Sequence, residues 1–206
     1  MRLTLITAAL VVFVGCKKDE PVAPKATSAA ATTQASIDPI DGAKAFPFTQ
    51  AESKLNWTGR KVTGAHEGSF ATFGGIIEVV DNDAAKSRVR AEIDMNSLTT
   101  SPDKLAGHLK SDDFFGVEKF PFANFVSTSV AKNETGYTVT GNLTMHGVTR
   151  ALSFPATITM SDSEVTVNAE FAINRKEFGV VYPGKPDDLI SDDVALKLEI
   201  HAKKKG

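Results

Sequence analysis

The segment YTVTGNLTMH, residues 137–146, decides the fold class that the sequence predicts. Every second residue from Tyr137 to Met145 is apolar or glycine, and the residues between them are polar. Successive side chains of a β-strand point to opposite faces of a sheet. The period of two therefore predicts a strand with one buried face and one exposed face.

The same alternation recurs along the chain in short blocks that end at turn residues such as Asn82 and Gly147. The predicted strands cover residues 46–48, 54–58, 69–80, 88–95, 122–130, 137–146, 152–160, 165–173 and 194–202. No block has the strand–helix–strand spacing of a parallel sheet, so the sheet should be antiparallel. We predict an all-β fold of about eight antiparallel strands in a barrel, with a sandwich as the alternative.

A different kind of segment, SPDKLAGHLKSDDFFGVEKFPFANF, lies between two of these strands at residues 101–125. Ser101 followed by Pro102 is typical of a helix start, because serine caps free N–H groups and proline suits the first helical position. Leu105 and Leu109 then fall on one face of the helix. Ser111, followed by two aspartates, resembles a second cap. We predict a short helical insertion over about residues 101–116.

This insertion carries more apolar surface than an exposed connection can hold, with phenylalanines at positions 114, 115, 120 and 122. Each phenylalanine brings a large apolar area and no polar group. Two roles follow from this composition. The segment plugs an open end of the β-structure, or it helps to line a cavity for an apolar ligand.

The N-terminal segment predicts export and a lipid anchor. Arg2 precedes an apolar run, in the order of a secretory signal peptide, which we assign to residues 1–15. The run ends in FVGC, which resembles a bacterial lipobox with Cys16 as the lipidated residue; an ordinary signal peptide with an incidental cysteine is the alternative. Residues 16–44 are rich in small and polar residues, so we expect a lipid-anchored flexible tether before a folded domain at 45–206.

Composition and motifs argue against several classes of function. A net charge of −2 does not fit a nucleic-acid-binding protein, which usually carries a basic excess. The four histidines (His66, His108, His146 and His201) have no metal-binding spacing, and the aspartate pairs lack the alternate spacing of a calcium loop. No G-x-S-x-G motif is present. We therefore predict no metal site, no catalytic site and a protein that is not an enzyme.

Several separated motifs resemble those of one family. They are LNWTGRKVTGAHEGSFATFGG (55–75), IDMNSLTT (93–100), KLAGHLKSDDFFGVEKFPFANFVST (104–128), GYTVTGNLTMHGVTRALSFPA (136–156), FAINRKEFGV (171–180) and ISDDVALKLEIHA (190–202). In this order they resemble the YceI-like family of secreted bacterial proteins, from Phe46 to Ala202. The resemblance implies a lipocalin-like barrel that binds a long apolar amphiphile, such as a polyisoprenoid or a similar lipid.

The resemblance also bears on ligands, partners and location. It implies no cofactor other than a bound isoprenoid lipid or quinone-like molecule, and it leaves a homodimer open. With a lipobox, it implies a bacterial lipoprotein held to a membrane by its N-terminus. Lys17 follows the cysteine without an aspartate retention signal, so we expect a protein facing the periplasm, with the outer membrane favoured.

The candidate ligand-binding residues are apolar side chains on the faces predicted to point inward. They are Trp57, Phe70, Phe73, Ile93, Leu109, Phe114, Phe115, Phe125, Leu143 and Phe171. The alternative is that they fill the barrel as a dry core, because burial of a phenylalanine is stabilising without any ligand. His66, His108 and Arg175 are candidate contacts for a lipid head group, with a structural role, such as an ion pair of Arg175 with an aspartate, as the alternative.

Two other functions remain open from the sequence. One is a stress-related or quinone-handling periplasmic protein, which would need a cofactor or a polar cluster deep in the barrel. The other is a structural surface module with a filled barrel, which would have no interior void.

Overall fold

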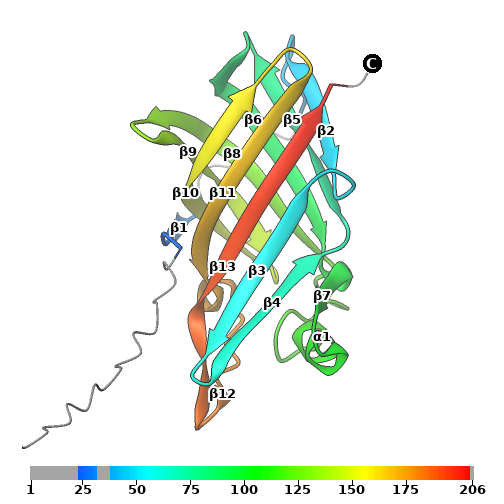
Figure 1. Ribbon diagram of the computed structural model, residues 1–206, viewed down its shortest axis with the longest axis vertical. Helices are drawn as coiled ribbons and strands as arrows, with labels where there is room; N and C mark the ends of the chain where they lie inside the picture. The colour runs from blue at the N-terminus through cyan, green and yellow to red at the C-terminus, as the bar shows by residue number, and fades with distance from the viewer. Residues whose placement is uncertain (1–22, 32–37, 205–206) are drawn as a thin grey trace, which may run out of the picture.

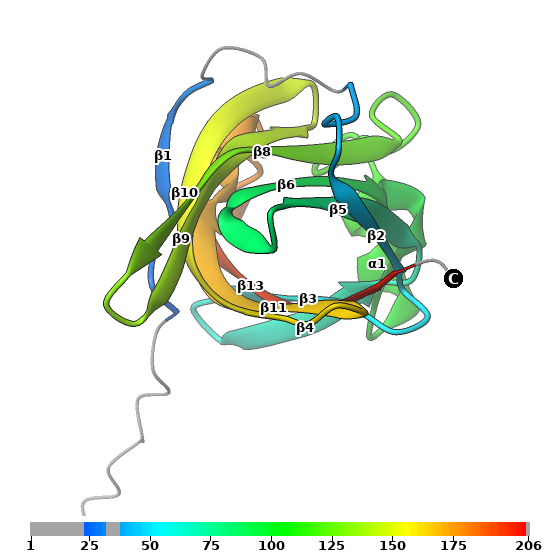
Figure 2. The same ribbon diagram turned by 90° about the horizontal axis from the view of Figure 1, so that it is seen from above.

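One long antiparallel sheet curls round on itself to form the body of the molecule, as Figure 2 shows from above. The structure is a computed structural model that describes residues 23–31 and 38–204. The strands are β1 (Thr27–Ala30), β2 (Lys44–Thr49), β3 (Lys54–Lys61), β4 (Gly64–Phe70), β5 (Phe73–Val80), β6 (Asp83–Asp94), β7 (Leu98–Thr100), β8 (Phe122–Asn133), β9 (Gly136–Met145), β10 (Val148–Met160), β11 (Glu164–Asn174), β12 (Gly184–Lys185) and β13 (Asp188–Lys203). The helices are η1 (Met95–Ser97), α1 (Asp103–Lys110) and η2 (Arg175–Phe178).

The sheet has the strand order β2-β5-β6-β8-β9-β10-β11-β13-β3-β4-β7. The chain just after β2 comes back beside the end of β13, because His201 N–H donates to Ser53 Oγ over 3.0 Å and Lys203 pairs with Glu52 at 3.0 Å. The sheet therefore curls through most of a circle. This confirms the predicted all-β antiparallel barrel.

More strands are present than the nine segments in which alternation predicts a strand. The additional strands are β1, β4, β7 and β12. Three of them have only four, three and two residues, too few for a period of two to stand out. The fourth, β4, has the sequence GAHEGSF, in which glycines and a glutamate hide the pattern.

Each end of the barrel contains apolar side chains that are almost completely buried. The end with the β5–β6 and β10–β11 turns, which we call the far end, buries Phe46, Val79, Val165 and Ala202 to 1 % exposure or less. The opposite end carries α1, residues 111–120 and η2, and we call it the cap end (Figure 1). Phe178 of η2 is fully buried there.

The helical insertion is shorter than predicted and is capped differently. Helix α1 has Pro102 as its N-cap residue, with no side-chain hydrogen bond, so the prediction that Ser101 caps the helix is wrong. Ser111 does not start a second helix. It ends α1, since its N–H and its hydroxyl both donate to His108 O. The chain then turns through Gly116, which has a positive φ of 51°.

Part of the predicted tether lies on the barrel. Within residues 16–44, Thr27–Ala30 forms β1 and pairs with β10. Ile40 N–H donates to Oε1 of the buried Glu78 over 3.0 Å, so the chain is also fixed just before β2. The expectation of a flexible tether does not hold for these parts. A strand that pairs through its backbone needs no apolar side chains, which is why composition did not reveal it. The predicted signal peptide and Cys16 lie outside the described residues.

Close contact between β3, β4 and β7 depends on a glycine. A Cβ atom on Gly68 would lie 2.1 Å from Thr99 O and 2.4 Å from Cζ2 of Trp57. The indole of Trp57 therefore lies against the backbone of β4 at Gly68. A larger residue at position 68 would fit only if Trp57 or the backbone of β7 moved.

We expect Gly68→Ala to destabilise the protein by roughly 1–3 kcal/mol, as overpacking of a close-packed site does. Gly64→Ala is the matched control, because a Cβ at Gly64 on the same strand has nothing within 4 Å. Urea unfolding of both variants checks this. Equal stability of the two variants would contradict the proposed packing constraint.

Candidate ligand cavity

The curled sheet encloses a cavity of about 260 Å³. Its wall is made by residues of every strand from β2 to β11 and of β13, together with side chains from the cap end. Every lining residue except Ser87 and Arg175 is apolar or glycine. Typical ligand pockets measure about 300–1,000 Å³. The volume of this cavity therefore lies just below the usual range. The cavity also differs from most ligand pockets because its wall carries almost no polar group.

All ten predicted inward-facing residues lie on this one cavity. They are Trp57, Phe70, Phe73, Ile93, Leu109, Phe114, Phe115, Phe125, Leu143 and Phe171. The sequence prediction left out lining residues of β10 and β13, among them Leu152, Phe154, Ile158, Leu196, Leu198 and Ile200. These residues follow the same alternation, so the signal that identifies them was present. A dry core would fill the interior completely, whereas side chains leave a cavity in this one.

The segment after α1 closes the cap end of the cavity. Leu109, Phe114 and Phe115 line it, and Phe114 is only 6 % exposed. Leu105, one helical turn before Leu109, is not among the lining residues. The insertion is thus a cover over the end of the barrel, and it also forms part of the cavity wall.

Aromatic contacts join this cover to the loop after η2. The ring of Phe114 lies 5.0 Å from that of His108 and 5.0 Å from that of Tyr182, and the rings of His108 and Tyr182 are 5.1 Å apart. His108 Nε2 also lies 3.0 Å from Asp113 Oδ2. His108 therefore holds the cover together, and it does not line the cavity.

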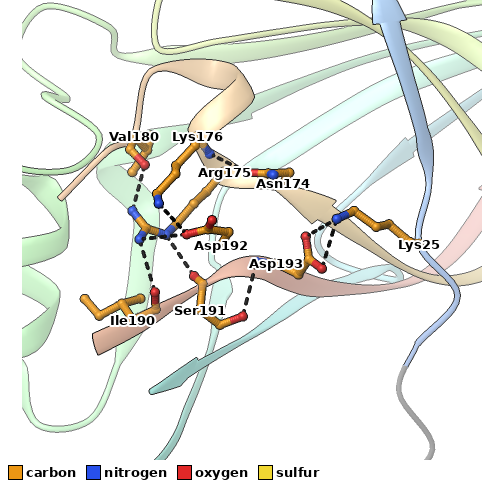
Figure 3. Close-up of polar contacts among 9 residues, drawn as sticks. All are labelled: Lys25, Asn174, Arg175, Lys176, Val180, Ile190, Ser191, Asp192 and Asp193. Atoms are coloured by element: carbon orange, nitrogen blue, oxygen red, sulfur yellow. Dashed lines mark hydrogen bonds and ion pairs between the residues drawn. The ribbon is translucent and has the colours of Figure 1, made fainter. Parts of the chain in front are cut away.

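Arg175 is the one charged side chain on the cavity wall, but its guanidinium is turned to the backbone of the η2–β13 region (Figure 3). Its Nε donates to Ser191 O over 2.9 Å, Nη1 to Val180 O over 2.7 Å and Nη2 to Ile190 O over 3.4 Å. Asp192 Oδ1 lies 3.7 Å from Nη2. Burial lowers the pKa of Arg175, and the Asp192 carboxylate opposes this shift. The geometry matches the alternative of an ion pair with an aspartate.

The remaining histidines lie away from the cavity wall. His66 is on β4, opposite Gly59 of β3, and is half-buried. His146 Nδ1 lies 3.1 Å from Phe178 O, and its ring contacts Phe120. In the part of the chain that the structure describes, no group of three or more His, Cys, Asp or Glu residues could hold a metal ion. Within the same residues, no helix is long and apolar enough to cross a membrane.

Asp188 ties the β3–β4 turn to the start of β13. Its carboxylate lies 2.5 Å from Lys61 Nζ and accepts from both the N–H and the hydroxyl of Thr63, over 3.1 and 2.9 Å. The hydrogen bond from Lys61 lowers the pKa of Asp188 below its ordinary value of 3.8; desolvation opposes this shift, and the two hydrogen bonds from Thr63 add to the lowering. This contact joins the β3–β4 turn to the β12–β13 turn.

Comparison with known proteins places this arrangement in a family. Residues 46–202 match the model of the YceI-like domain. The chain belongs to the YceI-like family. Among curated proteins, a UPF0312 protein of Yersinia enterocolitica is 41 % identical over 92 residues. This match covers 45 % of the chain and 48 % of the relative, so the chain spans about half the length of the curated relatives it matches.

Solved structures share the same barrel. BcnA of Burkholderia cenocepacia is 24 % identical with a TM-score of 0.69, covering 76 % of this chain and 99 % of that one. A polyisoprenoid binding domain from Saccharophagus degradans is 16 % identical with a TM-score of 0.62, covering 79 % and 99 %. The YCEI protein of Campylobacter jejuni is 23 % identical with a TM-score of 0.59, covering 68 % and 85 %. At these identities the likeness establishes the fold.

We expect Arg175→Lys to destabilise the protein by roughly 2–3 kcal/mol, because an ammonium group cannot reach all three carbonyl oxygens and leaves buried acceptors unpaired. Lys176→Met is the matched control. Lys176 Nζ pairs with the same Asp192 at 2.8 Å but is half exposed, so its loss should cost less than about 1 kcal/mol. Denaturant unfolding measures both. Equal losses of stability in the two variants would show that the three carbonyl contacts of Arg175 do not stabilise the fold.

The lowered pKa of Asp188 gives a pH dependence of known sign. Because the folded-state pKa lies below the unfolded one, the Asp188 carboxylate stabilises the fold above the unfolded pKa, and this contribution is lost as the pH falls through the folded value. We expect the NMR titration midpoint of Asp188 to lie below 3.8 and to rise in Lys61→Met. An unchanged midpoint in Lys61→Met would show that Lys61 is not the main cause.

Proposed function

We propose that this protein binds a long apolar amphiphile, a polyisoprenoid or a similar lipid, inside its barrel and carries or sequesters it without catalysing a reaction. The observation that carries the proposal is the cavity inside the barrel, whose wall is almost free of polar groups. A hydrocarbon chain needs no hydrogen-bond partner in such a site. A polar substrate would lose its hydrogen bonds to water there and find few donors or acceptors in return.

The size of the cavity makes an accidental void a poor explanation. A cavity in a protein core costs about 24 cal/mol per Å³, so 260 Å³ left empty would cost about 6 kcal/mol. Whole domains are stable by only about 5–15 kcal/mol. A ligand that fills the space would recover much of this cost. The protein is therefore expected to gain markedly in stability when the cavity is occupied.

The comparisons support the ligand class. One structural relative is described as a polyisoprenoid binding domain, and the chain shares its fold. Membership of the YceI-like family and this relative favour a binding protein over an enzyme. A quinone with an isoprenoid tail belongs to the same chemical class, since its tail would occupy an apolar cavity in the same way.

We propose further that the protein is a lipoprotein, attached through Cys16 and facing the periplasm, with the outer membrane favoured. The lipobox-like FVGC sequence and the apolar run before it support this proposal. Metabolic labelling with a clickable fatty acid would test it. The wild-type protein should carry the label, and the Cys16→Ser variant should not. Equal labelling of the two proteins would exclude lipidation at this residue.

The direct test is native purification followed by organic extraction and mass spectrometry. We expect an isoprenoid or a similar lipid in the extract, and we expect Phe114→Asp to lower its occupancy by about tenfold or more, because a carboxylate on the cavity wall is costly to desolvate beside hydrocarbon. Phe114 lines the cavity at 6 % exposure.

Phe122→Asp is the matched control, since Phe122 is at the cap end, 48 % exposed and not on the cavity wall. Its lipid occupancy should equal that of the wild type, and far-UV circular dichroism should show that both variants fold. Protein that is consistently free of lipid would refute the proposed function. Full lipid occupancy in Phe114→Asp would show that the insertion only plugs the end of the barrel and takes no part in lipid binding.

A further inference from the structure

The barrel wall contains a seam between β10 and β11. Their register pairs run only from Thr157 with Asn168 to Met160 with Val165. Nearer the cap end, β10 pairs instead with β1, from Thr27 with Ser153 to Ala30 with Arg150. On the other side of the gap, Ala26 N–H donates to Ala172 O of β11 over 2.8 Å, and Ala172 N–H donates to Pro24 O over 2.9 Å. Residues 24–30 therefore complete the wall where two strands separate.

Residues 24–30 are held weakly compared with other parts of the wall. Their side chains are small, and Ala26 is the one buried apolar side chain among them. Ser28 Oγ is buried with no hydrogen-bond partner within the described residues, which costs stability. The ion pair of Lys25 with Asp193, at 2.8 Å, joins side chains that are 56 % and 42 % exposed and therefore contributes little to stability (Figure 3).

The cavity lies directly behind this seam. Leu152 and Phe154 of β10 and Phe171 and Ile173 of β11 all line it. The rings of Phe154 and Phe171 stack across the seam, with centroids 4.1 Å apart and an interplanar angle of 12°. One short strand and one pair of aromatic rings thus separate the cavity from the outside at this place.

Both ends of the barrel are harder to open. The far end is closed by fully buried side chains, including Phe46 and Val165. The cap end is closed by Phe114, Phe178 and Val180, all at 6 % exposure or less. Exposure of buried apolar surface to water is unfavourable, and opening either end exposes several such side chains. Residues 24–30 carry one buried apolar side chain, Ala26, so their own displacement exposes little apolar surface, and the stacked pair Phe154 and Phe171 is what remains to be parted.

We propose that the seam between β10 and β11 is a lateral portal through which an apolar ligand enters and leaves the cavity, and that β1 is the strand that closes it. The proposal rests on the proposed function, because a portal needs a ligand that occupies the barrel. Passage requires a minor state in which residues 24–30 leave the wall and Phe154 and Phe171 move apart.

A reversible disulfide tests the portal. Ala29 and Ala151 face each other in the register of β1 and β10, so Ala29→Cys with Ala151→Cys, in a full-length Cys16→Ser background, would lock the strand in place. The probe is N-phenyl-1-naphthylamine, an apolar dye that fluoresces when bound, in stopped-flow experiments. Minor open states are populated at roughly 0.1–10 %, so the lock should slow association and dissociation by more than about tenfold without changing Kd. Dithiothreitol should restore both rates.

The matched control is a disulfide across the paired part of the same two strands, Thr157→Cys with Asn168→Cys. It should leave the rates unchanged, and equal slowing by both disulfides would overturn the portal in favour of general stiffening. Unchanged rates with β1 locked would overturn the portal alone. Absence of any binding in the Cys16→Ser protein would overturn the proposed function and the portal together.

A second variant opens the seam. Ala26→Pro removes the N–H that donates to Ala172 O, and loss of one hydrogen bond should speed probe exchange by roughly 2–10-fold. Ala31→Pro is its control, because Ala31 is exposed and follows β1. Exchange rates that are equal in Ala26→Pro and Ala31→Pro would count against β1 as the closing strand, whatever the result of the disulfide experiment.

Discussion

The structure depends on a sheet whose apolar face is buried only because the sheet curls round to meet itself. A flat sheet with one apolar face needs a second layer to cover it. Here the strands of the one curled sheet, from β2 at one edge to β7 at the other, supply both sides of the interior, and helix α1 with the segment after it covers one end. The curl also leaves a space in the middle, since the inward side chains do not fill it. The cavity is thus a consequence of the same geometry that makes the fold stable.

Two charged side chains that are buried near the ends of the sheet, Arg175 and Glu78, find their partners within the protein. Arg175 donates to three backbone carbonyls of the η2–β13 region, and Glu78 accepts from Arg88 at 2.8 Å and from the N–H of Ile40. Neither group offers its charge to the cavity. The interior therefore remains a hydrocarbon-like environment, although charged residues lie close to the wall. This arrangement explains why a fold with so many ion pairs encloses such an apolar space.

The amino-acid sequence predicted the features that depend on local pattern. Alternation identified the long strands, and it placed Trp57, Leu143 and Phe171 correctly on the inner face. It could not reveal β1, because the pairing of Thr27–Ala30 with β10 is made by backbone groups that every residue carries. It also could not show which partners Arg175 would find, since Val180 and Ser191 contribute only carbonyl oxygens. Serine and proline at 101–102 suggested a helix cap that the tertiary structure does not use.

The position of β1 also has a mechanical consequence. The chain enters the barrel wall at Pro24, well before it reaches β2, and it makes backbone hydrogen bonds to Ala172 at that point. A pulling force on the N-terminus is therefore carried first by a four-residue strand with small side chains. This strand gives way at a lower load than β2, whose Phe46 and Phe48 are packed in the core. Residues 24–30 thus act as a weak link in series with the barrel, so that tension on the N-terminal end is released before the load reaches the rest of the fold.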